Sequence, residues 1–324
     1  MYLMHVLSDD PHLLRTVAPQ GDTPPHAGVP PDEEAHALWR TLAGDRPAWW
    51  VERHDVDAPP GPWIVLREAS VSHLDVLGAL VAGGQSLPDG TTAVAMAGRF
   101  QGQRGRIWHA EPGNLQLVTH LNVGLPADTV QAALAALPAV AVADAITTLA
   151  GVEDLVGVKW VNDVVWRDAK VAGVLTRSDV VAGRVRSVRF GIGVNVARTP
   201  ALPPGDPAAL PPAALADAHE TFAMTGAWAV FLPHVVQRLA DLRDLLHREG
   251  ADAIVDRYRA HATFLGRDVT IHPVDGPADV PPIVTGRVEA LLPDLTLRID
   301  GAPKPITTGR MRFHGAQSSH HAKR

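Results

Sequence analysis

The spacing of apolar residues predicts several long helices. Apolar side chains recur every three or four positions in these segments, which places them on one face of a helix. The expected helices cover about 72–82, 129–149, 222–248 and 251–260. Pro138 lies inside the second of them. Because proline removes a backbone donor, we expect that helix to be interrupted or to restart there.

Shorter apolar or alternating runs, bounded by Gly, Pro, Asn and Asp, predict strands. In the first two thirds of the chain they cover about 63–66, 91–97, 115–123, 156–160, 164–166 and 170–181. After residue 263 the period becomes two, and short strands are expected at 267–272, 283–291, 295–299 and 304–308. This order predicts the α/β (α+β) class, with a mixed β-sheet and packed helices followed by a small β domain.

The first 60 residues carry the weakest pattern. Prolines and glycines break any periodicity between about 18 and 31, which predicts a linker. A short helix is expected at 32–42, with Asp32 as its N-cap. We therefore divide the chain into four parts: an N-terminal extension with a Pro-rich linker (1–60), a main domain (61–261), a small β domain (262–314) and a disordered tail (315–324).

Composition places the chain among ordinary globular proteins. Its 324 residues are 46% hydrophobic and 20% charged, enough for a sizeable core. We find no apolar run that approaches the length of a membrane span, and no basic region followed by an apolar segment at the N-terminus. The sequence therefore predicts a soluble, cytoplasmic protein that does not insert into a membrane.

Charge and cysteine content remove several function classes. The chain has no cysteine, which excludes disulfides, thioester intermediates and thiolate zinc sites. Its formal net charge of −6 gives no general support for nucleic-acid binding, and we find no basic recognition helix. The 16 histidines show no metal-ligand spacing. We therefore expect neither a DNA-binding repressor nor a histidine metal site.

The most informative segment is Lys159-Trp160-Val161-Asn162-Asp163, followed by Lys170-Val171-Ala172-Gly173. A lysine inside an apolar strand must find an anionic partner, so an anionic ligand is the natural explanation for two of them. The simpler alternative is a strand-edge lysine that extends to water, with Asn162 and Asp163 forming a turn. A tight turn at 167–169 places Lys170 at the start of a strand.

Two further motifs flank this segment. Upstream, a glycine-punctuated arginine loop runs from Gly98 to Trp108 and leads through His109-Ala110-Glu111-Pro112-Gly113-Asn114-Leu115 into the next strand. Downstream, Gly191-Ile192-Gly193-Val194-Asn195 forms a strand with two glycines. Taken singly, the arginine loop could be a solvated hairpin, and Gly-x-Gly is common.

The four motifs in this order resemble the catalytic core of the biotin protein ligases. The resemblance covers roughly residues 63–200. It implies an ATP-dependent enzyme of the biotin/lipoate protein ligase family without the DNA-binding winged helix, and an SH3-like barrel as the small β domain. Such an enzyme activates biotin as biotinyl-5'-AMP with ATP and Mg²⁺. It then acts as a biotin--[biotin carboxyl-carrier protein] ligase, whose partner is a carboxylase carrier domain; a homodimer is compatible with this.

The resemblance also implies a role for each matching residue. Lys170 would neutralise the charge between carboxylate and α-phosphate, and Asp163 would hold Mg²⁺ or orient the acceptor lysine. The arginine loop would fold over the adenylate and exclude water. The expected substrate- and adenylate-binding residues are Gly102, Gln103, Arg104, Gly105, Arg106, Trp108, Gly113, Asn114, Lys159, Trp160, Asn162, Gly173 and Asn195.

The identity of the acid stays open in the sequence. The family's Ser-Thr-Asn is replaced by Ser70-Val71-Ser72 or by Ser72-His73-Leu74, and Ala95-Met96-Ala97 occupies the place of its glutamine. One alternative is a related ligase or transferase for lipoate or octanoate, whose apolar chain needs a pocket without hydrogen-bonding partners. Another is a non-catalytic relative that binds a nucleotide or an acyl-adenylate.

Overall fold

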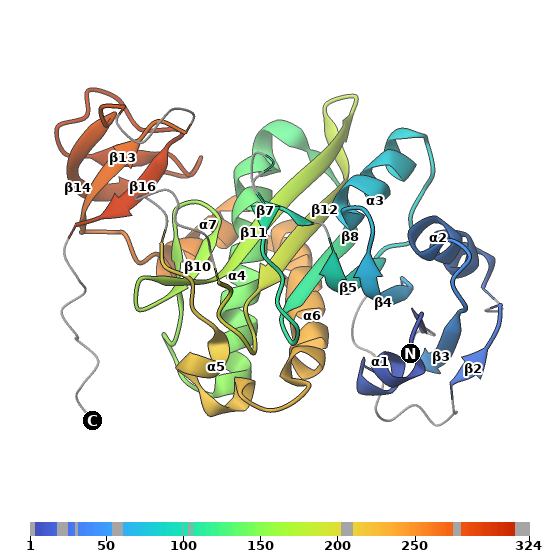
Figure 1. Cartoon of the computed structure of the whole chain (residues 1–324). Helices are drawn as coiled ribbons and strands as arrows, with labels where there is room; N and C mark the ends of the chain where they lie inside the picture. Colours follow the sequence, from blue (N-terminus) through green and yellow to red (C-terminus); the bar gives the residue numbers. More distant parts are fainter. Residues whose placement is uncertain are drawn as a thin grey trace.

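The computed structural model describes residues 4–17, 25–29, 32–53, 61–98, 100–102, 105, 107–201, 210–274 and 280–314. Within these residues, ten strands form one mixed sheet in the order β2-β3-β1-β4-β5-β8-β12-β11-β10-β9. Figure 1 shows this sheet crossing the molecule. The strands are β1 (Met4–Ser8), β2 (His26–Ala27), β3 (Trp49–Arg53), β4 (Trp63–Ala69), β5 (Thr92–Gly98), β8 (Leu115–Pro126), β9 (Gly157–Lys159), β10 (Asp163–Trp166), β11 (Ala169–Val181) and β12 (Arg184–Val194).

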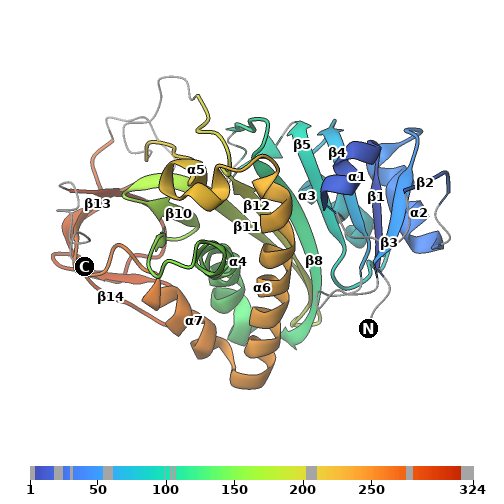
Figure 2. The same ribbon diagram turned by 90° about the horizontal axis from the view of Figure 1, so that it is seen from below.

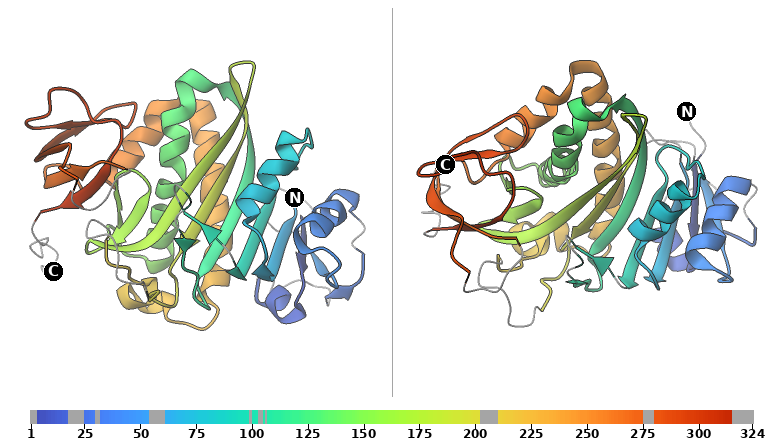
Figure 3. Two further views of the ribbon diagram at one scale, coloured as in Figure 1. Left: turned by 45° about the horizontal axis from the view of Figure 1, so that its top comes forward. Right: turned by 90° about the horizontal axis from the view of Figure 1, so that it is seen from above.

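Helices cover both faces of this sheet because its strands alternate between two apolar clusters. Along β4, Trp63 and Val65 join the larger cluster, whereas Ile64 and Leu66 join the smaller one. The larger cluster contains α1 (Pro11–Val17), α4 (Ala127–Ala150), α6 (Ala227–Glu249) and α7 (Ala251–Ala260). The smaller contains α2 (Glu33–Ala43) and α3 (His73–Ala82), on the opposite face (Figures 2 and 3). The predicted mixed α/β fold with packed helices is confirmed.

The N-terminal strands belong to the main sheet. Strand β1 pairs with β3 antiparallel and with β4 parallel, so it lies between an N-terminal strand and the predicted main domain. Sequence patterning missed β1 and β3, although it identified the helix α2 and its N-cap Asp32, whose side chain accepts from Glu34 and Ala35. Most of the predicted linker and the boundary at residue 60 lie outside the described residues.

The predicted small group of C-terminal strands is also confirmed. Among the described residues, a second antiparallel sheet has the order β15-β14-β13-β16. Its strands are β13 (Asp268–His272), β14 (Val284–Leu291), β15 (Leu297–Ile299) and β16 (Arg310–Phe313). The main domain contacts it where the indole Nε1 of Trp160 donates to the carbonyl of Leu295 over 2.7 Å. The predicted tail, 315–324, lies outside the described residues.

Three expectations about local structure were wrong. Helix α4 continues through Pro138, which is buried against neighbouring elements whose packing offsets the lost hydrogen bond. Residues 304–308 form no strand beyond one bridge between Ile306 and Leu297, and the edge strand is 310–313. Residues 223–226 do not continue into helix α6, because Gly226 has a φ of 80° and the helix begins after it.

The expectation that no apolar run approaches a membrane span was also wrong. Helix α4 is long and apolar enough to cross a membrane by length and composition alone. However, 67% of its most apolar window is buried inside the protein, where the helix contacts α6, α7 and β11. A helix surrounded by core elements is apolar on all sides, which gives it the composition of a span.

The place of β1 between β3 and β4 predicts that the N-terminal region cannot be removed without damage. Deletion of residues 1–60 would uncover Trp63, Ile64 and Val65, whose side chains are fully buried. It would also free one edge of β4 for aggregation. We expect the truncated protein to melt at a clearly lower temperature or to aggregate, measured by thermal unfolding and light scattering. An unchanged melting temperature would instead indicate an independent extension.

Candidate active site

The site is built on one row of residues that are paired across four strands. Gln116 on β8 faces Gly193 on β12, Gly193 faces Gly173 on β11, and Gly173 faces Asp163 on β10. Paired residues in a sheet share one face. The row therefore carries an amide at one end, a carboxylate at the other, and a floor of two glycines between them.

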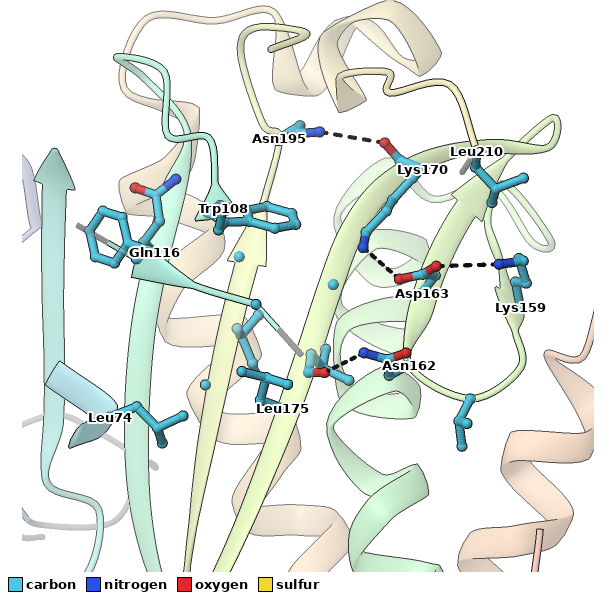
Figure 4. Close-up of a pocket in the computed structure, with 18 of the residues that line it drawn as sticks. Leu74, Trp108, Gln116, Lys159, Asn162, Asp163, Lys170, Leu175, Asn195 and Leu210 are labelled. Carbon is cyan, nitrogen blue, oxygen red and sulfur yellow. Dashed lines mark hydrogen bonds and ion pairs between the residues drawn. The ribbon is translucent and has the colours of Figure 1, made fainter. Parts of the chain in front are cut away.

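The carboxylate end holds two lysines. Asp163 Oδ1 lies 2.6 Å from the Nζ of Lys170, and its Oδ2 lies 3.6 Å from the Nζ of Lys159 (Figure 4). Lys159 is 7% exposed, so the sequence-based expectation that a buried lysine needs an anionic partner is met within the chain by Asp163. Two cations share one carboxylate here, which leaves an excess of positive charge for an anionic ligand.

The pKa of Asp163 lies below its ordinary value. Burial alone would raise this pKa, but the ammonium groups of Lys170 and Lys159 outweigh burial and stabilise the ionised carboxylate. Asp163 is therefore an anion throughout the physiological range. It cannot serve as a proton donor there, and its two oxygens instead pair with the two lysines.

The backbone of Lys170 is fixed by a neighbouring segment. Its N–H donates to the carbonyl of Pro211 over 2.7 Å, and its carbonyl accepts from Ala213 over 2.9 Å. The side-chain Nδ2 of Asn195 donates to the carbonyl of Ala213 at 3.0 Å and reaches that of Lys170 at 3.4 Å. Asn195 thus positions the strand that carries Lys170, and its Oδ1 is buried without a hydrogen-bond partner.

The indole of Trp108 lies over the glycine floor. A β-carbon on Gly193 would come within 2.4 Å of the ring, and one on Gly173 within 3.1 Å of it. The Nζ of Lys170 lies 5.3 Å from the centroid of the indole, within the range of a cation–π contact. Only glycine at positions 173 and 193 lets the indole approach the sheet so closely. The close approach of a ligand at Gly173 stays a prediction.

A cavity of about 420 Å³ opens above this row, on the α3 face of the sheet. Figure 4 shows Gln116 on one side of Trp108, with Lys170 and Asp163 on the other. Of the predicted site residues within the described part of the chain, the lining includes Gly102, Trp108, Lys159, Trp160, Asn162, Asp163, Lys170, Gly173 and Asn195. The structure therefore brings most of them together around one cavity.

Several predicted residues have structural partners. The Nδ2 of Asn162 donates to the carbonyl of Val174 over 2.9 Å, and the indole of Trp160 is bonded to Leu295. Asn114 is fully buried: its Nδ2 donates to the carbonyl of Arg198, and its Oδ1 accepts from the backbone of residues 197 and 198. These contacts hold loops in place, so ligand binding by the same side chains stays a prediction.

The arginine loop is described only in part. Strands β6 (Phe100–Gln101) and β7 (Ile107–Trp108) pair antiparallel at its base. Gly105 is exposed with a φ of 72°, a conformation that favours glycine. Gln103, Arg104 and Arg106 lie outside the described residues, and so do residues 202–209. Gly113, with a φ of 89°, packs where a β-carbon would approach Ala197 within 2.9 Å.

Sequence analysis missed two groups of lining residues. The first is Gln116, at the amide end of the glycine row, together with Ser72 and His73, which the sequence showed only as replacements for the family's Ser-Thr-Asn. The second comes from the small β domain and consists of Val274, Thr307, Thr308, Gly309 and Arg310. Nothing in the local pattern points to Gln116 or to the second group, because their proximity to the cavity depends on strand register and on how the small domain packs.

His73 is neutral at physiological pH. Burial disfavours its charged form and Arg46 repels it, which together lower its pKa to about 4 despite a hydrogen bond with the backbone of Ala93. Its Nε2 is buried without a hydrogen-bond partner. A neutral imidazole can therefore present a hydrogen-bonding atom at the end of the cavity that is remote from the lysines.

The residues present do not form a dedicated magnesium site. Among the described residues that line the cavity, Asp163 is the only carboxylate, and both of its oxygens face lysines. The described residues also contain no cluster of three or more His, Cys, Asp or Glu side chains that could hold a metal ion. Direct binding of Mg²⁺ by Asp163 would require a lysine to move. Because Mg²⁺ commonly binds through substrate phosphates, the geometry favours a metal that arrives with ATP.

Comparison with known protein families gives the same assignment as the motifs. Residues 86–195 match the biotin/lipoate A/B protein ligase family. The matched segment contains the lysine cluster, both floor glycines and Gln116. The matched segment spans 110 of the 324 residues of the chain.

Curated relatives match over a similar segment. The chain is 39% identical over 119 residues to the bifunctional ligase/repressor BirA of Bacillus subtilis, a match that covers 35% of this chain and 34% of that protein. It is 38% identical over 118 residues to the biotin--[acetyl-CoA-carboxylase] ligase of Paracoccus denitrificans, covering 36% of this chain and 47% of that protein. The match thus spans about a third to a half of these relatives.

Solved structures resemble the fold over a longer stretch. The biotin protein ligase from Aquifex aeolicus in complex with biotin and ATP aligns with a TM-score of 0.57 at 20% identity, covering 78% of this chain and 99% of that one. The apo structure of the same ligase aligns with a TM-score of 0.55 at 17% identity, with the same coverage. At this identity the likeness establishes the shared fold.

The charge cluster predicts a pH-dependent cost of removing Asp163. Asp163→Asn leaves two lysines facing a neutral amide, and loss of one partner from a buried pair costs roughly 3 kcal/mol. The lowered pKa means that the carboxylate stabilises the fold above its ordinary pKa of 3.8 and loses this effect as the pH falls through the folded value. Thermal unfolding should therefore show a large difference between wild type and variant near neutral pH, which shrinks below pH 3.8.

Asp168→Asn is the matched control. Asp168 forms a bidentate pair with Arg267 at 2.7 and 2.8 Å, and asparagine tolerates its φ of 63°. This variant should lose stability as well, but ligand binding in the cavity should be unchanged. A Tm difference for Asp163→Asn that is independent of pH would contradict the account.

Proposed function

We propose that this protein is an ATP-dependent ligase that activates biotin as biotinyl-5'-AMP and transfers the biotinyl group to a lysine of a biotin carboxyl carrier protein domain. The observation that carries the proposal is the pair of lysines held by Asp163 at one end of a glycine-floored cavity. Both reactants of the first step are anions, and this cavity places an excess of positive charge beside a surface that a ligand can approach closely.

In the first step, an oxygen of the biotin carboxylate attacks the α-phosphorus of ATP. The new bond to phosphorus forms as the bond to the bridging oxygen breaks, and pyrophosphate leaves. Lys170 lies at the cavity surface with 30% of its side chain exposed, so its ammonium can contact both the carboxylate and the α-phosphate. It would reduce their repulsion and stabilise charge on the non-bridging oxygens in the transition state. Mg²⁺ bound to the triphosphate would neutralise the leaving group.

In the second step, the free amine of the carrier lysine attacks the acyl carbon. The bond between this carbon and the phosphate oxygen breaks, AMP leaves, and the nitrogen loses a proton to form the amide. The mixed anhydride must be protected from water until the carrier arrives. Trp108 covers the glycine floor from one side, and the arginine loop, whose base is the β6–β7 hairpin, would close over the adenylate.

The comparisons support this proposal, but the sequence matches cover only part of the chain. The relatives that match include one protein named biotin--[acetyl-CoA-carboxylase] ligase and one named bifunctional ligase/repressor BirA. The fold is that of a ligase solved with biotin and ATP. A cytoplasmic location and the absence of DNA binding stay predictions from the sequence.

Acid-dependent pyrophosphate release tests the proposed function. Purified protein with ATP and Mg²⁺ should release pyrophosphate when biotin is added, and much less with lipoate or octanoate. Release with lipoate or octanoate alone would reassign the enzyme to that acid. If a folded sample releases no pyrophosphate with any of the three acids, the proposal is contradicted. The protein would then be better explained as a non-catalytic relative that binds a nucleotide.

The role of Lys170 predicts that Lys170→Ala loses adenylate formation. Removal of one preorganised charge at a developing anion costs roughly 100- to 1,000-fold in rate. The far-ultraviolet circular dichroism spectrum should be unchanged, because the side chain is partly exposed. Lys304→Ala, which removes an exposed lysine of the small β domain, is the control and should keep full activity. Near-normal turnover by Lys170→Ala would exclude the assigned role.

The expected lid function of the arginine loop predicts a different defect for Arg104→Ala. The adenylate should form but escape or hydrolyse before transfer, because the loop would hold its phosphate less tightly. The measurement is the ratio of free AMP to carrier-bound biotin, which should rise. Arg298→Ala, on the exposed side of β15, serves as the control. An unchanged ratio would mean that the loop does not retain the intermediate.

A further inference from the structure

Gln116 is a buried amide with no hydrogen-bond partner. Only 3% of the residue is exposed, yet neither its Nε2 nor its Oε1 is paired. An unpaired amide in such a place disfavours the folded protein, because it has given up water and gained no bond in return. Replacement by an apolar side chain would remove this cost. A buried amide that has no hydrogen-bond partner within the chain indicates that a bound ligand supplies the partner.

The amide faces the cavity of the proposed active site. Gln116 lies on β8, where alternate side chains share one face of the sheet. It is on the same face as Val118, which packs in the smaller apolar cluster with α3. It lines the cavity together with Ser72 and His73. The Nε2 of His73 is buried without a partner as well. Among the described residues that line the cavity, His73, Trp108 and Asn195 each have one buried polar atom without a hydrogen-bond partner, whereas both polar atoms of Gln116 are unpaired.

Strand register fixes the distance between this end and the lysines. Gln116 and Asp163 are the two ends of the row that passes through Gly193 and Gly173. Three strand spacings separate them, which is roughly 14 Å along the sheet. A ligand whose carboxylate meets Lys170 would therefore present the opposite end of its acyl group, and not its carboxylate, to Gln116.

We propose that Gln116 determines which acid this site accepts, by hydrogen-bonding a cyclic urea or cyclic amide at the end of the acid remote from its carboxylate. This inference rests on the proposed function and deepens it. A primary amide offers one acceptor and two donors side by side. A cyclic urea offers a carbonyl beside an N–H, which is the complementary pair, and the Nε2 of His73 can accept from its second N–H. A fatty acyl chain has neither group.

The same geometry explains why a simple acyl chain is rejected. An alkyl chain in this cavity would keep the amide of Gln116 away from water and leave it unpaired. A site built to pair a polar group discriminates strongly against an analogue that lacks it. The replacement of the family's Ser-Thr-Asn and glutamine in this sequence therefore does not leave the acyl end without polar contacts, because Gln116 and His73 face it.

The test uses Gln116→Met, which keeps a similar volume and removes both hydrogen-bonding groups. We expect the KM for biotin in pyrophosphate release to rise about 10- to 100-fold with little change in kcat, as for two lost hydrogen bonds. Inhibition by the thiolane pentanoic acid, which keeps the ring sulfur and side chain of biotin but lacks its urea, should be the same in both proteins. The Tm of Gln116→Met should be equal to or above that of the wild type.

Thr119→Val is the matched control on the same strand. Thr119 points to the opposite face, where its Oγ1 lies 3.1 Å from that of Thr92, so its hydrogen bond is satisfied within the chain. This variant should lower the Tm and leave the KM for biotin unchanged. The pair of variants thus separates a polar group that binds ligand from one that holds the fold.

The outcomes distinguish this inference from the proposed function. A wild-type protein that does not use biotin overturns the proposed function, and this inference with it. A wild-type protein that uses biotin, with an unchanged KM in Gln116→Met, overturns the inference alone. The same holds if Gln116→Met weakens inhibition by the acid without a urea as much as it weakens binding of biotin, because the side chain would then contribute shape and not hydrogen bonds.

Discussion

The site depends on the burial of Asp163 between two lysines. A lysine that is 7% exposed needs a counter-charge, and one carboxylate serves both Lys159 and the more accessible Lys170. The sharing keeps Asp163 ionised and leaves the cluster with a surplus of positive charge. The three residues come from β9, β10 and β11, so the antiparallel pairing of these strands is what assembles the charge. The proposed binding of an anionic ligand in the cavity depends on this arrangement.

The glycine floor turns this charged end into an elongated site. Because Gly173 and Gly193 have no side chains, the indole of Trp108 can lie directly on the sheet, and the cavity extends from the lysines to Gln116. The pairing of the strands then sets the distance between the two chemically different ends of the cavity. One end suits a carboxylate next to a phosphate, and the other suits a neutral polar group. The small β domain supplies part of the wall, and the bond from Trp160 to Leu295 joins that domain to the segment that carries Lys159 and Asp163.

The sequence identified the charged end because its signal is local. Lys159, Asp163, Lys170 and Gly173 lie within fifteen residues of one another, and their order with the neighbouring motifs resembles a known family. The helices expected at 72–82 and 251–260 were also correctly placed, as was the N-cap Asp32. These features depend on periodicity or on adjacent residues, which a single sequence displays directly.

What the sequence could not show depends on contacts between distant segments. A lone Gln116 in an apolar strand looks like an outward-facing residue until pairing with Gly193 reveals which face it occupies. Strands β1 and β3 were missed because β1 finds its partners at residues 49–53 and 63–65. Pro138 was expected to break a helix that tertiary packing keeps continuous, and the edge strand 310–313 was confused with 304–308 because both are short and bounded by glycine.

The most direct test of the account is a crystal structure with a biotinyl-adenylate analogue in which a sulfamate replaces the phosphate. We expect the sulfamate to lie beside the Nζ of Lys170, the acyl chain to cross the glycine row, and the urea to lie within about 3 Å of the amide of Gln116. An analogue bound with its adenine at Gln116, or with its urea facing only apolar side chains, would contradict the assignment of the two ends.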